Sequence, residues 1–150
     1  MIKKKIFFFF LFFFYTDFYH SLASINNKII VKVENQIVSS YELKNKIRTL
    51  LILSQQEITQ QNIDLTKQRA LQQLIDFNLK KIQIEKFNIK DNDNKKLDQY
   101  LSRLASKFNT DVNGVKKIFS NNDLNYEIYI DEIKTEYSWQ KLIYNKFRKE

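Results

Sequence analysis

The chain has 150 residues, a length that suits one domain. It contains one Gly and no Pro, which argues against an all-β fold, because such folds need many turns with special backbone geometry. It also has no Cys, which excludes disulfides and thiolate metal sites. The net charge is +8, but no basic stripe with interleaved aromatics appears, so we predict no nucleic-acid partner.

The first 23 residues have the pattern of a signal peptide. Lysines at positions 3–5 precede an apolar run over residues 6–15, and Ser21 and Ala23 then place small side chains two apart. The apolar run is too short for the roughly 20 residues with which a helix spans a bilayer. We therefore expect cleavage after Ala23, export to a bacterial periplasm, and membrane contact only in transit. The alternative is an uncleaved anchor.

The expected mature domain, residues 24–150, lacks the side chains on which most enzymes depend. The single histidine, His20, belongs to the expected signal peptide, and there is no Cys. The usual general base, metal ligand and thiol nucleophile are therefore missing. The sequence also contains no Gly-rich phosphate loop and no G-x-S-x-G elbow. We predict no catalytic residue, no metal, no cofactor and no enzymatic activity.

The elements of the mature part begin with a predicted β-hairpin. β-Branched residues dominate 29–33, Glu34 and Asn35 can turn, and 36–38 can return as a second strand. Ser39 or Ser40 can then cap a first helix. The apolar residues that repeat at helical spacing in it are Leu43, Ile47, Leu50 and Leu51. The stretch 54–61 loses this period and is predicted to be a loop.

A long second helix is predicted from about Asp64 to Lys86. Its broad apolar face carries Leu71, Leu74, Ile75, Leu79 and Ile82, and is widened by Phe77 and Ile84. A helix with so wide an apolar face should be central in the packing. Asn92 and Asp93 can cap a third helix. Its stripe consists of Leu97, Leu101, Leu104 and Phe108.

Two further helices complete the prediction. Thr110 can cap a short fourth helix, which Gly114 weakens slightly. Asn125 opens a final helix that runs close to the C-terminus. The apolar residues of the fourth helix are Val112, Val115, Ile118 and Phe119, and those along one side of the last are Tyr126, Tyr129, Ile130, Ile133 and Tyr137. The sequence thus predicts a mostly α domain of five helices with a small N-terminal β-hairpin.

The order of these elements and several local strings resemble SurA-type periplasmic chaperones. The strings are IIVKVENQIV at 29–38, SSYEL at 39–43, RALQQLIDFNLKKIQIEKFNI at 69–89, LNYEIY at 124–129 and IKTE at 133–136. Together they are similar to the substrate-binding N-terminal domain of that family. The resemblance implies a chaperone that binds unfolded outer-membrane proteins. Family members usually continue into parvulin-type prolyl isomerase domains, and since no such segment follows before Glu150, we expect no isomerase activity.

The last predicted helix offers a candidate peptide-binding surface. Its first apolar side is best explained as core, but Trp139, Ile143 and Phe147 form a second, offset stripe. One helix in a small domain cannot easily bury both stripes, so we expect part of the second to be exposed or to contact a partner. The candidate binding residues are Tyr137, Trp139, Ile143, Tyr144 and Phe147. For each of these residues taken singly, a place in the core remains the alternative.

Two functions remain open from sequence. The first is a chaperone-like binder of extended polypeptides. The second is an exported structural or adaptor protein that docks one fixed partner or forms a homodimer. The predicted strand 29–33 is apolar on both faces, with only Lys32 as a charge to discourage edge pairing. We therefore expect its edge to be covered by another chain, either a second copy or an added client strand.

Overall fold

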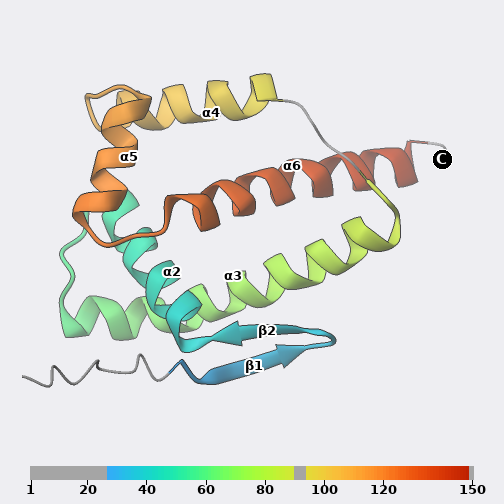
Figure 1. The fold of residues 1–150 in the computed structure, drawn as a ribbon, viewed down its shortest axis with the longest axis horizontal. Helices are drawn as coiled ribbons and strands as arrows, with labels where there is room; N and C mark the ends of the chain where they lie inside the picture. Colours follow the sequence, from blue (N-terminus) through green and yellow to red (C-terminus); the bar gives the residue numbers. More distant parts are fainter. Residues whose placement is uncertain (1–26, 90–93, 149–150) are drawn as a thin grey trace, which may run out of the picture.

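The computed structural model describes residues 27–89 and 94–148 and confirms a mostly α fold of five helices with an N-terminal β-hairpin (Figure 1). Its elements are β1 (Ile29–Val33), β2 (Gln36–Ser39), α2 (Ser40–Leu53), α3 (Gln60–Lys86), α4 (Asn94–Lys107), α5 (Val112–Asn121) and α6 (Tyr126–Phe147). The expected signal peptide, residues 1–23, and the expected helix cap at Asn92 and Asp93 lie outside the described residues.

The hairpin buries one face and exposes the other. β1 and β2 pair antiparallel, with Val31 opposite Val38 and Lys32 opposite Ile37. An irregularity between Ile29 and Val31 leaves Ile30 out of this register. Val38 is buried, whereas Ile30 and Ile37 are exposed. Because a two-stranded hairpin is marginal alone, its packing against α3 is what holds it in place.

Ser39 starts α2 with a reciprocal pair of hydrogen bonds. The backbone N–H of Glu42 donates to the Ser39 hydroxyl over 3.2 Å, and the backbone N–H of Ser39 donates to the Glu42 carboxylate over 2.7 Å. Such a capping box satisfies two donors that the first helical turn otherwise leaves unpaired. Of the two serines that the sequence offers as caps, Ser39 is the one that acts.

The loop before α3 is shorter than the sequence predicts. α3 begins at Gln60 rather than near Asp64, because the Thr59 hydroxyl accepts a hydrogen bond from the backbone N–H of Asn62 and caps the helix there. The first three residues of α3 are polar, so hydrophobic periodicity gives no sign of them. The prediction that α3 is central is confirmed, since it packs against α2, α6 and both strands.

The cap of α5 also differs from the prediction. Asp111, not Thr110, is the N-cap, and its carboxylate accepts from the backbone N–H of Gly114 over 2.7 Å. A carboxylate at this position is favoured by the positive end of the helix dipole. A larger residue than glycine would not fit at position 114, because a β-carbon there would overlap the side chain of Thr110.

The buried apolar residues form two separate clusters. The hairpin cluster consists of Val38, Leu43, Ile47, Leu51, Ala70 and Leu74. The α5 cluster consists of Leu101, Leu104, Ala105, Val115, Phe119, Leu124, Tyr129 and Ile130. α2 contributes to both, since Leu51 belongs to the hairpin cluster while Ile52 and Leu53 pack against the α5 cluster.

The two halves of α6 are buried in different ways. In the first half, Tyr129 and Ile130 enter the α5 cluster. In the second half the buried residues are Thr135, Ser138 and Leu142, of which only Leu142 is apolar. The C-terminal ends of α3 and α6 lie side by side at the right of Figure 1, beyond the last residues that either helix gives to a cluster.

Candidate binding surface

Four large apolar side chains are exposed where α3 and α6 end. They are Phe87, directly after α3, and Ile143, Tyr144 and Phe147 on the last turns of α6. We call this set the α3–α6 tip. Tyr144 is 57% exposed and Phe147 is 53% exposed, although both lie on a helix that is otherwise well packed. A group of exposed aromatic side chains on a small domain marks a candidate interaction site.

Basic side chains lie over the rings of the tip. The Lys146 ammonium is 5.6 Å from the centre of the Phe87 ring and 5.8 Å from that of Phe147, so it joins the ends of the two helices. The Arg148 guanidinium is 5.1 Å from the centre of the Tyr144 ring. These distances are within the range of cation–π attraction, which at exposed sites contributes about 0.5–1 kcal/mol.

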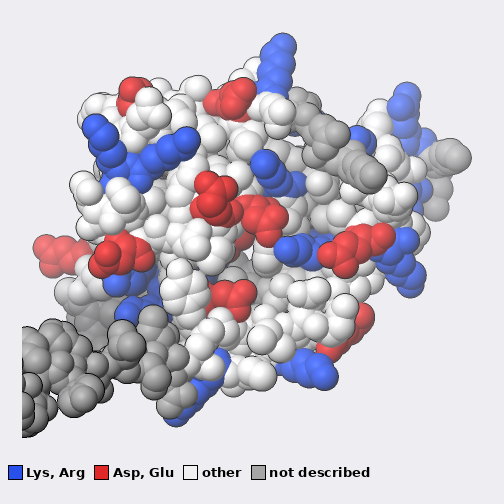
Figure 2. Space-filling view, viewed as in Figure 1, with Lys and Arg blue, Asp and Glu red and all other residues white. Residues whose placement is uncertain are grey.

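The surroundings of the tip are basic. Residues 83–89 and 141–148 carry four basic side chains, Lys86, Lys141, Lys146 and Arg148, and one acidic side chain, Glu85. Figure 2 shows several Lys and Arg side chains at the right-hand end of the molecule, where α3 and α6 end, with acidic atoms among them. The tip is therefore both aromatic and positively charged.

The structure brings together three of the five residues that the sequence singles out. Ile143, Tyr144 and Phe147 lie at the tip, whereas Trp139 is half-buried. Tyr137 is also half-buried, and its hydroxyl points to the backbone oxygen of Lys96 at 3.4 Å, a long hydrogen bond toward α4. Tyr137 therefore packs within the body of the protein rather than at the tip.

Phe87 belongs to the tip but is missed by the sequence prediction. It lies 60 positions before Phe147 in the sequence, and only the antiparallel return of the chain through α4 and α5 brings the two ends together. The feature of the sequence that could have identified Phe87 is its position directly after the last residue of α3, next to Lys86. An aromatic residue just past a helix end has no turn above it to cover its ring.

One stripe of α6 changes character along its length. Glu132, Glu136, Trp139 and Ile143 recur at helical spacing and share a side of the helix. The carboxylates of Glu132 and Glu136 contact lysines of α2 and α3. Further on, the same stripe becomes apolar, with Trp139 half-buried and Ile143 exposed. The stripe thus ends at the tip, in an apolar side chain that is exposed.

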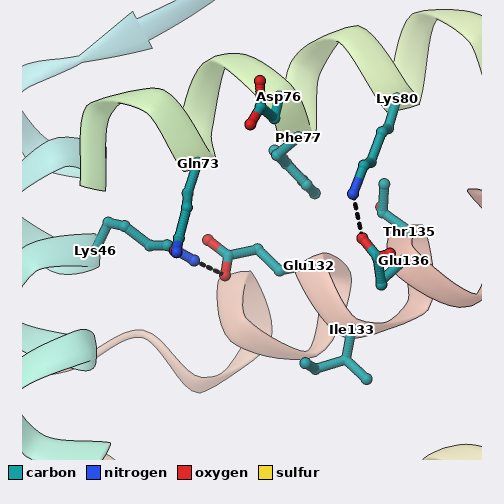
Figure 3. Close-up of a pocket in the computed structure, with 9 residues that line it drawn as sticks. All are labelled: Lys46, Gln73, Asp76, Phe77, Lys80, Glu132, Ile133, Thr135 and Glu136. Atoms are coloured by element: carbon teal, nitrogen blue, oxygen red, sulfur yellow. Dashed lines mark hydrogen bonds and ion pairs between the residues drawn. The ribbon is translucent and has the colours of Figure 1, made fainter. Parts of the chain in front are cut away.

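A cleft of about 310 Å³ lies between α2, α3 and α6 (Figure 3). Lys46 of α2 and Glu132 of α6 form an ion pair of 2.5 Å at one end, and both side chains are only 12% exposed. Lys80 of α3 and Glu136 of α6 pair at the other end. Phe77 points into the space between the two pairs in Figure 3.

The ion pairs that line the cleft join neighbouring helices, and they leave little free charge to bind a ligand. Each lysine that lines it is already neutralised by a glutamate of α6, and a third pair, Lys81 with Asp131 at 3.0 Å, links α3 and α6 nearby. A lysine and a glutamate that already pair with each other attract neither an anion nor a cation strongly. We therefore interpret the cleft as a polar seam that joins α6 to α2 and α3.

The buried tyrosines of α6 have a structural role. The hydroxyls of Tyr100 and Tyr129 are 2.6 Å apart and hydrogen-bond to each other. Burial, followed by this hydrogen bond, raises the pKa of Tyr129 well above its usual range. Burial also raises the pKa of Tyr126, with a contribution from Glu127. A raised pKa keeps both phenols neutral, which suits core residues and makes them poor general bases.

The outer face of the hairpin is a second exposed apolar surface. Ile29, Ile30 and Ile37 are all exposed there, and Tyr41 at the start of α2 is exposed as well. The sequence predicts that another chain covers the edge of this hairpin. Within the described residues these isoleucines remain exposed, so the prediction stays open.

Other kinds of site have no support in the part of the chain that the structure describes. Over residues 27–89 and 94–148, no three His, Cys, Asp or Glu side chains are grouped so that they could hold a metal ion. None of the helices in these same ranges combines the length and the apolar character needed to cross a membrane. Comparison with known proteins adds no relative, because no family model and no curated protein matches the chain.

Proposed function

We propose that this protein is a chaperone-like binder that holds unfolded, extended polypeptides at the α3–α6 tip. The observation that carries the proposal is the exposed aromatic set on two helix ends, Phe87 with Tyr144 and Phe147. Unfolded chains expose apolar side chains of many kinds, and aromatic rings offer them a large contact area with little demand on sequence. Because the tip is open rather than a closed pocket, it can accept segments that differ in length.

The setting of this activity follows from the sequence resemblance. The signal-like residues 1–23 support export to the periplasm, and the similarity to the substrate-binding domain of SurA-type chaperones supports unfolded outer-membrane proteins as clients. Catalysis is not part of the proposal. Mass spectrometry of the protein from its native membrane and periplasmic fractions tests the export step. Recovery of a chain that begins at Ser24 supports it, and an intact N-terminus contradicts it.

An aggregation-protection assay tests the binding activity. A denatured β-barrel protein is diluted from urea in the presence of the purified protein, and light scattering is followed over time. We expect the wild type to suppress scattering and the double variant Phe87→Ala/Phe147→Ala to lose most of this effect. The variant removes both rings that flank Lys146 while leaving the buried clusters untouched.

The chain offers a matched control for this variant. Ile58 and Leu65 are also exposed apolar residues, and Leu65 is 74% exposed. Leu65 lies at the other end of α3, about 33 Å from Phe87 along the helix axis. The double variant Ile58→Ala/Leu65→Ala should protect as well as the wild type. Equal loss in both variants, or full protection by the tip variant, would contradict the proposed site.

The exposed hairpin favours a second candidate function, self-association or docking of one fixed partner. Ile30 and Ile37 project from the outer face of a two-stranded sheet, and such a sheet can accept a further strand. Light scattering over a dilution series tests self-association. A mass that doubles with concentration in the wild type, but not in Ile37→Lys, supports a homodimer through this face. A constant monomer mass leaves the chaperone-like function as the better proposal.

A further inference from the structure

We infer that the α3–α6 tip prefers client segments in which aromatic residues stand beside Asp or Glu. This inference rests on the proposed function and adds a charge requirement to it. The tip is aromatic, but each of its three rings already has a cation over it. A bound segment must therefore meet Lys146 and Arg148 as well as Phe87, Tyr144 and Phe147.

The cations of the tip differ from the three lysines at and beside the cleft. Around the cleft, Lys46, Lys80 and Lys81 each have a carboxylate of α6 as partner. In the described ranges, Lys146 and Arg148 form no ion pair and lie over rings instead. Their charge is thus not cancelled by an acidic residue of this part of the chain. It remains available to a carboxylate that arrives with a ligand.

Stabilisation of the helix end is the simpler explanation for Lys146, and it accounts for only part of the arrangement. A cation in the last turn interacts favourably with the negative end of the helix dipole. That effect requires only a lysine near the last carbonyl groups of α6. It does not explain why the ammonium also lies 5.6 Å from the centre of the Phe87 ring, which follows the end of another helix.

The geometry suits a peptide with adjacent aromatic and acidic side chains. An incoming ring can pack on the exposed part of Phe147 or Phe87 while a neighbouring carboxylate reaches Lys146. A second carboxylate can reach Arg148 beside Tyr144. Each exposed ion pair contributes little on its own, so two of them should tighten binding by about tenfold at low salt.

An anionic membrane is a different class of partner that basic and aromatic residues can bind. Insertion into a bilayer needs an apolar wedge with its charges at the rim. At the tip, the Lys146 ammonium lies within 5.6 Å and 5.8 Å of the centres of the Phe87 and Phe147 rings, so inserting both rings would carry its ammonium toward the hydrocarbon. The arrangement therefore favours an extended polypeptide over a lipid surface.

Binding of three labelled peptides to the full-length purified protein tests the inference. The peptides share the same Phe and Tyr positions and differ only in the flanking residues, which are Asp, Asn or Lys. Fluorescence anisotropy gives each dissociation constant at low and high salt. We expect the acidic peptide to bind about tenfold more tightly than the neutral one at low salt, and the gap to narrow at high salt. The basic peptide should bind most weakly.

A charge-neutral variant isolates the contribution of the two cations. Lys146→Gln/Arg148→Gln should bind the neutral peptide nearly as well as the wild type but lose the preference for the acidic peptide. Lys67→Gln/Arg69→Gln is the matched control, because it removes the same charges from exposed positions near the other end of α3. This control should retain the preference. Circular dichroism of both variants checks that the helices are intact.

The outcomes separate this inference from the proposed function. Equal affinity of the wild type for all three peptides overturns the charge preference and leaves the chaperone-like function standing. An equal loss of preference in both glutamine variants also overturns it, because net charge would then be the cause. Binding to phosphatidylglycerol vesicles, with none of the peptides bound, overturns the inference in favour of a membrane surface. Failure of every peptide to bind, together with no aggregation protection, removes the proposed function itself.

Discussion

The aromatic residues of the α5 cluster and those of the α3–α6 tip are chemically alike and occupy opposite environments. Phe119 is fully buried and lies 5.3 Å, edge on, from the ring of Tyr126 and 5.0 Å from that of Tyr129. Phe87 and Phe147 are about half exposed, and the Lys146 ammonium lies 5.6 Å and 5.8 Å from their ring centres. The difference lies in what each helix end has to pack against.

Near its start α6 has α4 and α5 as neighbours, which complete a closed cluster around Tyr129. Near its end it lies beside the end of α3, and the buried residues of this half are Thr135, Ser138 and Leu142. An aromatic side chain supplies stability only where neighbours can surround it. At the tip the same side chains leave their contact area available to a ligand.

The largest effect expected from this comparison is the loss of stability in Phe119→Ala. The ring is fully buried and touches two other aromatic rings, so its removal leaves a cavity that the cluster cannot fill. We expect the free energy of unfolding to fall by about 4 kcal/mol. Urea denaturation followed by circular dichroism measures it. A loss below about 1 kcal/mol would mean that Phe119 is packed no more tightly than the side chains of the tip.

A smaller loss is expected where the seam between the helices is broken. Lys46→Ala removes the partner of the Glu132 carboxylate, which is only 12% exposed and cannot regain full hydration. We expect a loss of about 2 kcal/mol, below the range for fully buried pairs. The double variant Lys46→Met/Glu132→Leu should recover most of it. Similar losses in the single and double variants would show that the pair itself, rather than the stranded charge, stabilises α6.

The Tyr100–Tyr129 contact in the α5 cluster predicts that the stability of the fold falls at alkaline pH. The pKa of Tyr129 is raised above its ordinary value of 10.0 in the folded state, first by burial and then by its hydrogen bond with Tyr100. Above pH 10 the unfolded state therefore loses this proton first, so folding stability falls, whereas below pH 10 it is unaffected.

Between pH 10 and pH 11, the wild type should lose about 1 kcal/mol more stability than Tyr129→Phe, which has no phenol to ionise. At neutral pH the substitution itself should lower the free energy of unfolding by about 1 kcal/mol, because the Tyr100 hydroxyl loses its partner. Denaturation curves at these pH values provide the measurement. Parallel pH profiles for the two proteins would contradict the raised pKa.

The smallest loss of stability is expected at the tip. Phe87→Ala and Phe147→Ala should each reduce the free energy of unfolding by about 0.5 kcal/mol or less, as is usual for exposed positions. The double variant should thus be nearly as stable as the wild type while losing client protection. If it unfolds with a loss near that of Phe119→Ala, the tip is part of the core and the proposed site is wrong.

Most of the fold follows from local patterns in the sequence. The hairpin is set by β-branched residues around Glu34 and Asn35, and α2 and α6 begin at the predicted caps Ser39 and Asn125. The prediction is wrong about the starts of α3 and α5. Their caps, Thr59 and Asp111, are polar residues outside the apolar period. A cap depends on a single hydrogen bond, which periodicity cannot detect.

The candidate site is less predictable than the fold. Periodicity identifies the second stripe of α6 but cannot tell which of its members are covered in the fold, so half-buried Trp139 is grouped with exposed Phe147. It also places Tyr137 in the site, although Tyr137 faces α4. Phe87 comes from another helix, and its place beside Lys146 depends on the path of the whole chain.

The position of α2 in both clusters has a consequence for the order of folding. The hairpin cluster draws only on residues between Val38 and Leu74, so its contacts are close in sequence and can form early. The α5 cluster needs Ile52 and Leu53, which the first cluster holds in place. Asn45 also binds the backbone N–H of Asn125 over 2.9 Å, 80 positions away. We expect residues 29–86 to gain protection from hydrogen exchange first, with α4, α5 and α6 condensing onto the finished end of α2.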